Sequence, residues 1–183
     1  MSKIILGLAG EIASGKGTIA KYIVERYHGK SYRFSTMLRD LLDRLYLEHS
    51  RENMQTMSTM IRQSFGEDIM ARVMVEDIKK ESTDVIAIDG VRRLADIKYL
   101  RHLPGFKLAF IEADMKRRYE RIVQRGENPD DKEKTLEEFE REHKQESELQ
   151  IKDLRKNADL IINNDGSQED VYAQVDKMMK EIK

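Results

Sequence analysis

Seven residues near the N-terminus have the types and the spacing that bind phosphate. The segment from Gly10 to Lys16 reads G-E-I-A-S-G-K, and in this spacing the glycines let the backbone wrap a phosphate group. Inward-pointing N–H groups and the N-terminus of the following helix add partial positive charge. An apolar run, Ile4 to Leu8, precedes the loop, and a helical pattern follows from Ile19. We therefore predict a P-loop in which Lys16 reaches the β- and γ-phosphates of a nucleotide.

The loop departs from the commonest pattern at the position after the lysine. Most P-loops carry there the Ser or Thr that ligates Mg²⁺, whereas this chain has Gly17 and places the hydroxyl one residue later, at Thr18. We expect Thr18 to contribute to the Mg²⁺ site. The residues of this loop that we predict to bind the nucleotide are Gly10, Ala13, Ser14, Gly15, Lys16, Gly17 and Thr18.

Composition excludes several classes of protein. The 183 residues include 33 basic and 34 acidic ones, for a net charge of −1, which argues against nucleic-acid binding through bulk positive charge. The absence of cysteine excludes disulfides, thiolate zinc sites and cysteine nucleophiles. No apolar run is long enough for a membrane-spanning helix, and the N-terminal apolar segment is too short for a signal peptide. We expect a cytoplasmic protein of one domain, without nucleic-acid or membrane partners.

Strands and helices alternate along the chain. Short apolar runs bounded by Gly, Asp or Asn are typical of parallel strands that are covered on both faces. Alternation with helical patterns predicts an α/β domain with right-handed crossovers. The predicted strands are Ile4 to Leu8, Lys30 to Phe34, Val85 to Ile88, Leu108 to Ile111 and Leu160 to Ile162.

Two segments interrupt the alternation. Residues 35–82 hold three helical patterns, and residues 126–157 hold a turn (Gly126, Asn128, Pro129) followed by a long charged helix. Insertions of this kind are where lids and substrate-binding flaps sit. Capping boxes are predicted at two helix starts, Thr135 with Glu138 and Ser167 with Asp170.

Several motifs resemble nucleoside monophosphate kinases, adenylate kinase above all. Gly-Lys-Gly-Thr at residues 15–18 is similar to the adenylate kinase P-loop. Arg121 and Arg125 resemble the start of that family's lid, where two arginines meet the donor nucleotide. The segment Asn164-Asp165-Gly166-Ser167 resembles the loop that passes over the adenine, so the resemblance implies nucleotide contacts at Asp165 and Gly166.

The acceptor side carries a similar resemblance. Met37-Leu38-Arg39 resembles the family segment whose final arginine grips the acceptor phosphate, and residues 89–93, Asp-Gly-Val-Arg-Arg, resemble Asp-Gly-Phe-Pro-Arg. There the aspartate orders the Mg²⁺ shell and the arginine binds the acceptor. The segment from Ile61 to Arg72 resembles deoxynucleotide kinases. The resemblance thus implies an acceptor site of Arg39, Arg72 and Arg92 or Arg93.

The resemblance also implies an architecture. The family has a three-layer P-loop NTPase fold with a five-stranded parallel sheet in the order 2-3-1-4-5. Residues 1–183 would form a single kinase domain, with 35–82 as the helical acceptor-binding insertion and 126–157 as a short helical lid. Two departures are Thr36, where many relatives have an acidic residue, and a lid without the long zinc-bearing or β-rich insertion.

Each candidate also has an ordinary structural interpretation. Asp89 could cap a turn, but a carboxylate at a strand end facing a P-loop favours an Mg²⁺-ordering acid, partly through water. Arg92 and Arg93 compete for one role. The run 116–121 would usually be a solvated helix face, yet the i, i+4 spacing of Arg121 and Arg125 puts both on one side.

These observations predict an ATP-dependent small-molecule kinase. It would use ATP and Mg²⁺, with Lys16, Asp89, Arg121 and Arg125 as catalytic residues, to phosphorylate a small phosphorylated acceptor such as a nucleoside or deoxynucleoside monophosphate. The alternatives are an enzyme similar to dephospho-CoA kinase, and a switch or assembly ATPase that hydrolyses ATP without an acceptor. The sequence leaves open the acceptor, ATP against GTP, and monomer against homodimer.

Overall fold

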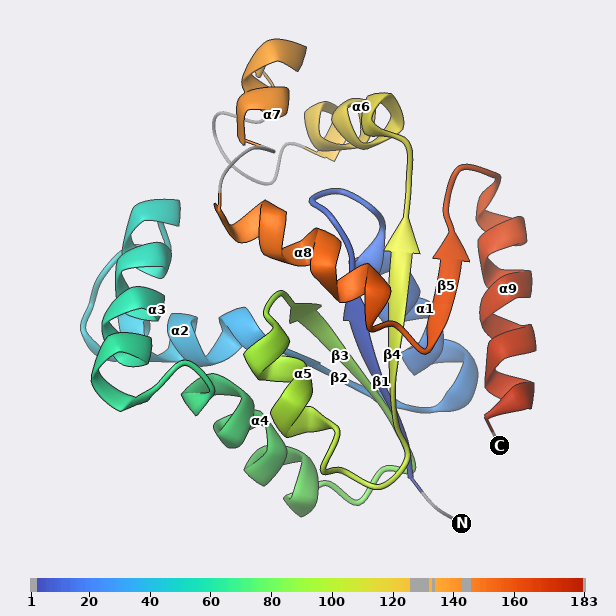
Figure 1. The fold of residues 1–183 in the computed structure, drawn as a ribbon, viewed down its shortest axis with the longest axis horizontal. Helices are drawn as coiled ribbons and strands as arrows, with labels where there is room; N and C mark the ends of the chain where they lie inside the picture. Colours follow the sequence, from blue (N-terminus) through green and yellow to red (C-terminus); the bar gives the residue numbers. More distant parts are fainter. Residues whose placement is uncertain (1–2, 126–131, 133, 143–145, 183) are drawn as a thin grey trace.

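A parallel five-stranded sheet organises the chain, in the order β2-β3-β1-β4-β5 (Figure 1). The computed structural model describes residues 3–125, 132, 134–142 and 146–182. The predicted α/β class and strand order are thereby confirmed. The strands are β1 (Ile4–Ala9), β2 (Lys30–Arg33), β3 (Val85–Val91), β4 (Phe106–Glu112) and β5 (Leu160–Asn163).

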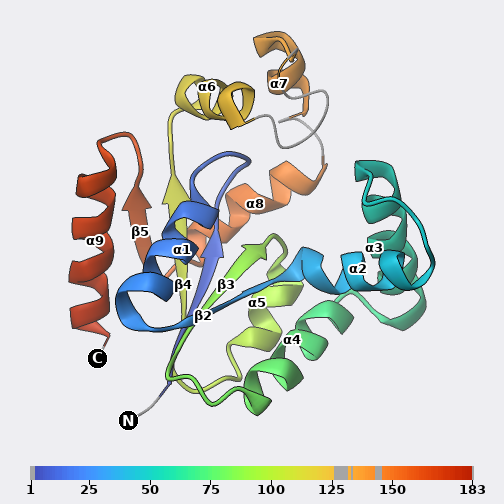
Figure 2. The same cartoon turned by 180° about the vertical axis from the view of Figure 1, so that it is seen from behind.

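Helices cover both faces of the sheet (Figures 1 and 2). This explains why β1 is continuously apolar, since alternate residues of the strand enter two different cores. Ile5 belongs to one buried cluster, whereas Leu6 and Leu8 belong to the other. The helices whose residues join the Leu6 cluster are α1 (Lys16–Tyr27) and α9 (Gln168–Glu181), and those that join the Ile5 cluster include α4 (Ile69–Lys80), α5 (Leu94–Leu100) and α8 (Glu146–Lys156).

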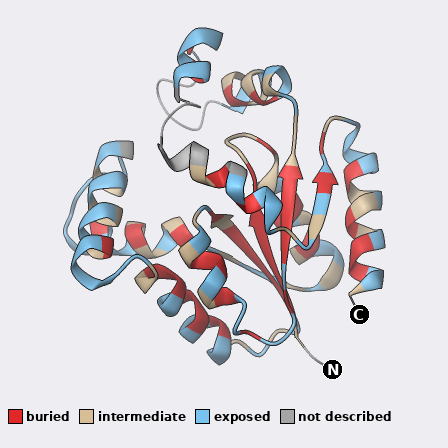
Figure 3. Ribbon diagram, in the orientation of Figure 1, coloured by how far each residue is buried: buried red, intermediate tan, exposed pale blue. Residues whose placement is uncertain are grey.

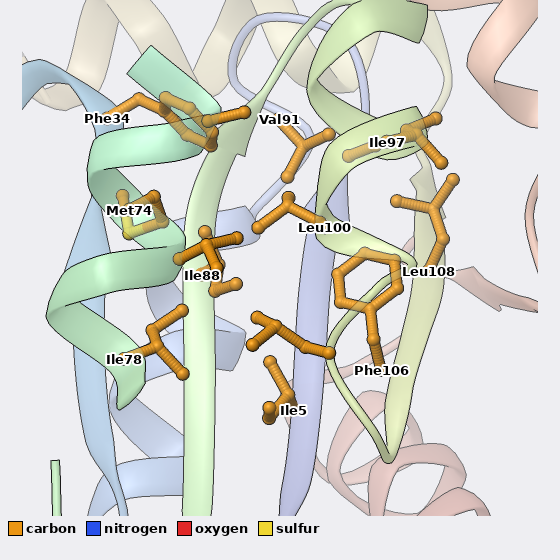
Figure 4. Packing of buried hydrophobic residues seen from close by; sticks show 14 of the residues in the cluster. Ile5, Phe34, Met74, Ile78, Ile88, Val91, Ile97, Leu100, Phe106 and Leu108 are labelled. Carbon is orange, nitrogen blue, oxygen red and sulfur yellow. The ribbon is translucent and has the colours of Figure 1, made fainter. Parts of the chain in front are cut away.

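The central strands are the most buried part of the molecule, as Figure 3 shows. Figure 4 shows Ile5, Ile88 and Leu108 from three neighbouring strands packed with helix residues such as Leu100. This packing fixes the carboxyl ends of β1 and β3 beside each other, with Leu8 in register with Asp89. Ligands of parallel α/β sheets bind at these ends.

The insertion after β2 contains three helices, as predicted. They are α2 (Phe34–Arg44), α3 (Arg51–Phe65) and α4. Ser50 begins α3 by accepting a hydrogen bond from the N–H of Asn53. Figure 1 shows α2 and α3 beyond the β2 edge of the sheet, away from the loop between β1 and α1.

The prediction of one long helix after the turn at residues 126–129 is wrong. The structure has two helices, α7 (Leu136–Glu142) and α8, and the predicted turn itself lies outside the described residues. Ile151 and Leu154 of α8 are 1% and 0% exposed and join the core, because they form an apolar stripe that the sheet can cover. Helix α8 therefore packs against the core through this stripe, and the assignment of residues 126–157 as a lid stays a prediction.

Both predicted capping boxes are confirmed. The Thr135 N–H and hydroxyl donate to the Glu138 carboxylate, and the Glu138 N–H donates back to the Thr135 hydroxyl. Ser167 and Asp170 form the equivalent box at the start of α9. Within the described part of the chain, no helix combines the length and the apolarity needed to cross a membrane.

The assignment of α8 to the core can be tested by stability. We expect Ile151→Val to lower the free energy of unfolding by about 1 kcal/mol, because a methylene is lost from a packed site. A matched control is Ile161→Val on β5, where the side chain is 50% exposed and the change should stay within about 0.5 kcal/mol. Urea unfolding of both variants measures the difference, and equal effects would contradict the core assignment of α8.

Candidate functional site

The loop between β1 and α1 has the backbone of a phosphate cradle. Gly10 and Gly15 have φ angles of 147° and 100°, a region that side chains disfavour. A Cβ on Gly10 would lie 2.4 Å from the carbonyl oxygen of Ile111, and a Cβ on Gly15 would lie 2.1 Å from Nδ2 of Asn164. Both glycines are therefore required by backbone angle and by space.

Lys16 begins α1 and folds back over this loop. Its ammonium donates to the carbonyl oxygens of Gly10 (2.6 Å) and Glu11 (2.8 Å). Beneath it Ser14 is fully buried, and the Ser14 carbonyl accepts a hydrogen bond of 2.7 Å from Nδ2 of Asn164, which follows β5. The loop is thus held from below, and its charged side chain lies on the concave side.

A cleft of about 1070 Å³ runs from this loop to the helical insertion. That volume is at the upper end for small-molecule sites. The sequence-predicted residues that line it are Ala13, Gly15, Lys16, Gly17, Thr18, Arg39, Asp89, Arg92, Arg93, Arg121, Arg125 and Gly166. Most of the candidate residues that the sequence indicated therefore lie around one cleft.

Four candidates do not line the cleft. Gly10 and Ser14 lie beneath the loop and shape it. Asp165 is occupied locally, since its carboxylate accepts hydrogen bonds from the Asp114 N–H and from the Asn163 amide. Arg72 is exposed on α4, because the apolar face of that helix turns into the core and leaves this position outside.

Asp89 lies on β3, two residues before the strand ends at Val91, and lines the cleft. It is paired with a residue that sequence reasoning missed. Its Oδ2 lies 3.2 Å from Nε of Arg33, and the Asp89 residue is only 8% exposed. Arg33 ends β2 in register with Asp89. The order of the strands brings them together, and that order is the signal that would have revealed the pair.

Two arginines of α6 (Met115–Arg125) face the P-loop side of the cleft. Arg121 donates through one terminal nitrogen to the backbone and side-chain oxygens of Asn164, at 2.8 and 3.2 Å. Its other terminal nitrogen is buried and has no hydrogen-bond partner among the described residues. Arg125, one turn later, lines the same cleft, as the i, i+4 spacing predicted.

A buried ion pair joins the insertion to the arginines after β3. Arg62 of α3 and Asp96 of α5 are 6% and 1% exposed, and their closest charged atoms are 3.3 Å apart. Burial raises the pKa of the Asp96 carboxyl, although Arg62 and backbone hydrogen bonds from Arg92 and Arg93 oppose the shift. The pair thus positions the neighbouring arginines, and no sequence spacing indicated it.

Among the residues that the structure describes, the buried side-chain nitrogen and oxygen atoms that lack a hydrogen-bond partner all lie at this cleft. Within the described ranges they are Ser35 Oγ, Arg62 Nε and Arg121 Nη1, and all three residues line the cleft. A buried donor without a partner costs about 1–3 kcal/mol. A ligand with acceptor oxygens would satisfy the donors on both walls.

The residues present fit a magnesium ion that arrives with a nucleotide. In the part of the chain that the structure describes, no cluster of three or more His, Cys, Asp or Glu could hold a metal alone. Thr18 and Asp89 line the cleft beside Lys16. Mg²⁺ commonly binds through one or two protein oxygens together with substrate phosphates and water.

The sheet order, the phosphate cradle and the cleft define a P-loop, kinase-like α/β protein. The chain belongs to the AAA domain family, whose model matches residues 9–140, and to the UPF0200 proteins. It is 30% identical over 172 residues to the UPF0200 protein of Methanoregula boonei, with 93% of each chain covered. It is 28% identical to that of Sulfurisphaera tokodaii, with 97% of each covered.

Solved structures share the fold at low identity. TT1252 from Thermus thermophilus matches with a TM-score of 0.64 and 15% identity, covering all of both chains. Shikimate kinase from Bacteroides thetaiotaomicron matches with a TM-score of 0.63 and 13% identity, covering 98% of both. These comparisons establish the fold of this chain.

Proposed function

We propose that this protein is an ATP-dependent phosphotransferase of the nucleoside monophosphate kinase type. The observation that carries the proposal is the presence of cationic and unpartnered donor groups on both walls of one cleft. The wall beside the P-loop carries the Lys16 ammonium and the unpartnered Nη1 of Arg121. The opposite wall, formed by α2 and α3 and called the insertion wall, carries the Arg39 guanidinium and the unpartnered Nε of Arg62. Arg39 has no acidic partner among the described residues. A nucleotide alone would leave the insertion wall unused.

Phosphoryl transfer asks the protein for positioning and charge neutralisation more than for covalent chemistry. Lys16 and the loop amides would hold the donor phosphates. Arg39, with Arg92 or Arg93, would hold the acceptor, while Arg121 and Arg125 would meet the charge that develops on the transferring group. No general base is needed, because the attacking phosphate oxygen is already ionised.

Thr18 and Asp89 would hold Mg²⁺, which supplies further neutralisation of phosphate charge when it is bound. The Arg33 guanidinium restrains the Asp89 carboxylate through a contact of 3.2 Å between Nε and Oδ2. A tightly fixed carboxylate suits an ion with strict octahedral geometry.

The test is an acceptor panel with ATP and Mg²⁺. Nucleoside monophosphates, deoxynucleoside monophosphates and dephospho-CoA are each incubated with the enzyme, and ADP, phosphorylated acceptor and free phosphate are quantified. We expect ADP to accumulate only when one of the monophosphates is present. If dephospho-CoA is the one acceptor of the panel that gives a phosphorylated product, the result would favour an enzyme similar to dephospho-CoA kinase. If free phosphate is released without an acceptor as fast as with one, the protein is better described as a switch that hydrolyses ATP. That result would contradict the proposal.

The role of Asp89 can be tested separately. We expect Asp89→Asn to raise the Mg²⁺ concentration for half-maximal rate about tenfold, since the amide keeps the size of the side chain but loses its charge. Arg33→Gln is the control, because it removes the ion pair and leaves the carboxylate. An identical shift in both variants would mean that the ion pair, and not a metal contact, is what the Asp89 substitution disturbs.

A further inference from the structure

We propose that Arg118 is a positioning residue that couples helix α7 to the phosphate-binding loop. A run such as residues 116–121 would usually be a solvated helix face, but Arg118 is only 2% exposed. It lies on α6 one turn before Arg121, on the side that faces the loop. The inference rests on the proposed nucleotide binding for only one of its two tests.

One side of the Arg118 guanidinium holds the loop. A terminal nitrogen lies 3.1 Å from the Glu11 carboxylate, and the other donates to the carbonyl oxygen of Ile12 at 3.4 Å. The Nε atom donates to the carbonyl oxygen of Ala113, the residue after β4, at 2.9 Å. These contacts fix the guanidinium between β4 and the middle of the loop.

The same guanidinium packs against Phe139 in the middle of α7 (Leu136–Glu142). Its central carbon is 5.8 Å from the centre of the Phe139 ring, within the range of a cation–π contact, and Phe139 is fully buried. Tyr119, the next residue on α6, contacts the Phe139 ring at 6.0 Å and donates to the Lys134 carbonyl at 3.0 Å. Figure 1 shows α7 beside α6, away from the sheet.

The burial of the Arg118 charge makes its contacts with the loop and with Phe139 depend on one another. A guanidinium taken out of water depends on its ionic partner and its hydrogen bonds, so loss of one contact destabilises the arrangement of the others. Arg121 adds a second hold on the loop, since it binds Asn164, which in turn binds the Ser14 carbonyl. Helix α6 thus contacts the loop directly through Arg118 and indirectly through Arg121. Arg118 also contacts Phe139 of α7.

An ordinary structural arginine would stabilise the fold without transmitting a change from Glu11 to Phe139. Transmission is therefore the property to measure. Glu11→Gln is the main variant, because the Glu11 side chain is 21% exposed and the neutral amide keeps its size. Arg117→Ala is the matched control, since Arg117 is an exposed arginine on the same helix.

The first test is amide hydrogen exchange on the full chain without ligand. We expect Glu11→Gln to speed exchange in peptides covering residues 134–142 about fivefold or more, since the far side of Arg118 loses its support. Arg117→Ala should leave those peptides unchanged. Unchanged exchange at residues 134–142 in Glu11→Gln would overturn the coupling.

The second test is a double-mutant cycle on ATP affinity by calorimetry, with Glu11→Gln and Phe139→Leu. We expect the double variant to lose about fivefold less ATP affinity than the product of the two single losses of affinity, because both substitutions act through Arg118. The two changes should have independent, multiplicative effects on ATP affinity when Arg118→Met is also present, because methionine removes the charge that pairs with Glu11. Independent effects in both backgrounds would overturn the proposal. Absence of ATP binding in the unaltered protein would refute the proposed function, and hydrogen exchange would still decide the coupling.

Discussion

Lys16→Ala should lower the rate of phosphoryl transfer by about 100-fold or more, the scale on which one preorganised charge stabilises a transition state. Lys16 begins α1, and its ammonium lies over the concave side of the loop, bonded to the Gly10 and Glu11 carbonyls. A phosphate in the cradle would receive that charge directly. The lysine is partly exposed, so the substitution should leave thermal unfolding nearly unchanged.

Rates with saturating ATP and the acceptor identified by the panel measure this loss. Lys79→Ala, an exposed lysine of α4 paired with Glu76, is the control and should match the unaltered enzyme. If Lys16→Ala keeps more than about a tenth of the rate, the loop does not act on the transferring group, because a loss that small is near 1.4 kcal/mol.

Arg39→Ala should raise the KM for the acceptor about 100-fold while leaving ATP affinity near its original value. Arg39 lines the insertion wall and has no acidic partner in the described chain, so its planar fork is available for a phosphate. Charge-assisted bidentate hydrogen bonds of this kind contribute about 2–3 kcal/mol. Arg39→Lys should rescue poorly, because it keeps the charge and loses the fork.

The control for Arg39 is Arg44→Ala, an exposed arginine at the far end of the same helix. Arg125→Ala provides a contrast, since we expect it to lower kcat with little change in acceptor KM. Initial rates with the acceptor varied separate the two effects. Equal weakening of ATP and acceptor in Arg39→Ala would contradict the assignment of separate walls and would agree with a site built around one nucleotide.

The sequence alone determined the phosphate cradle and the sheet. Residues 10–16 are contiguous in the sequence, so their spacing alone predicts the loop. The positive φ angles of Gly10 and Gly15 explain why glycine stands at these two positions. Strands such as β1 are buried on both faces, so their apolar runs stand out from the charged remainder. The capping boxes were predictable for the same reason, because their partners lie three residues apart.

Motif resemblance located the cleft but not its internal contacts. It indicated Arg39, Arg121 and Arg125, which all line the cleft. It also proposed Arg72 and Asp165, which lie outside that surface. The position of a polar side chain on an element depends on which face the core covers, and that face is set by packing rather than by the motif.

Only the tertiary structure decided which charges are buried and what they hold. Arg118 and Arg62 look like surface residues in the sequence, yet they are 2% and 6% exposed. Arginine is buried where partners meet it, and these partners, Glu11 and Asp96, lie 107 and 34 positions away. Pairings over such separations form when the chain folds, so local residue types cannot specify them. The sequence therefore determined the loop that we expect to bind phosphate, and the folded structure determined how that loop is held in place.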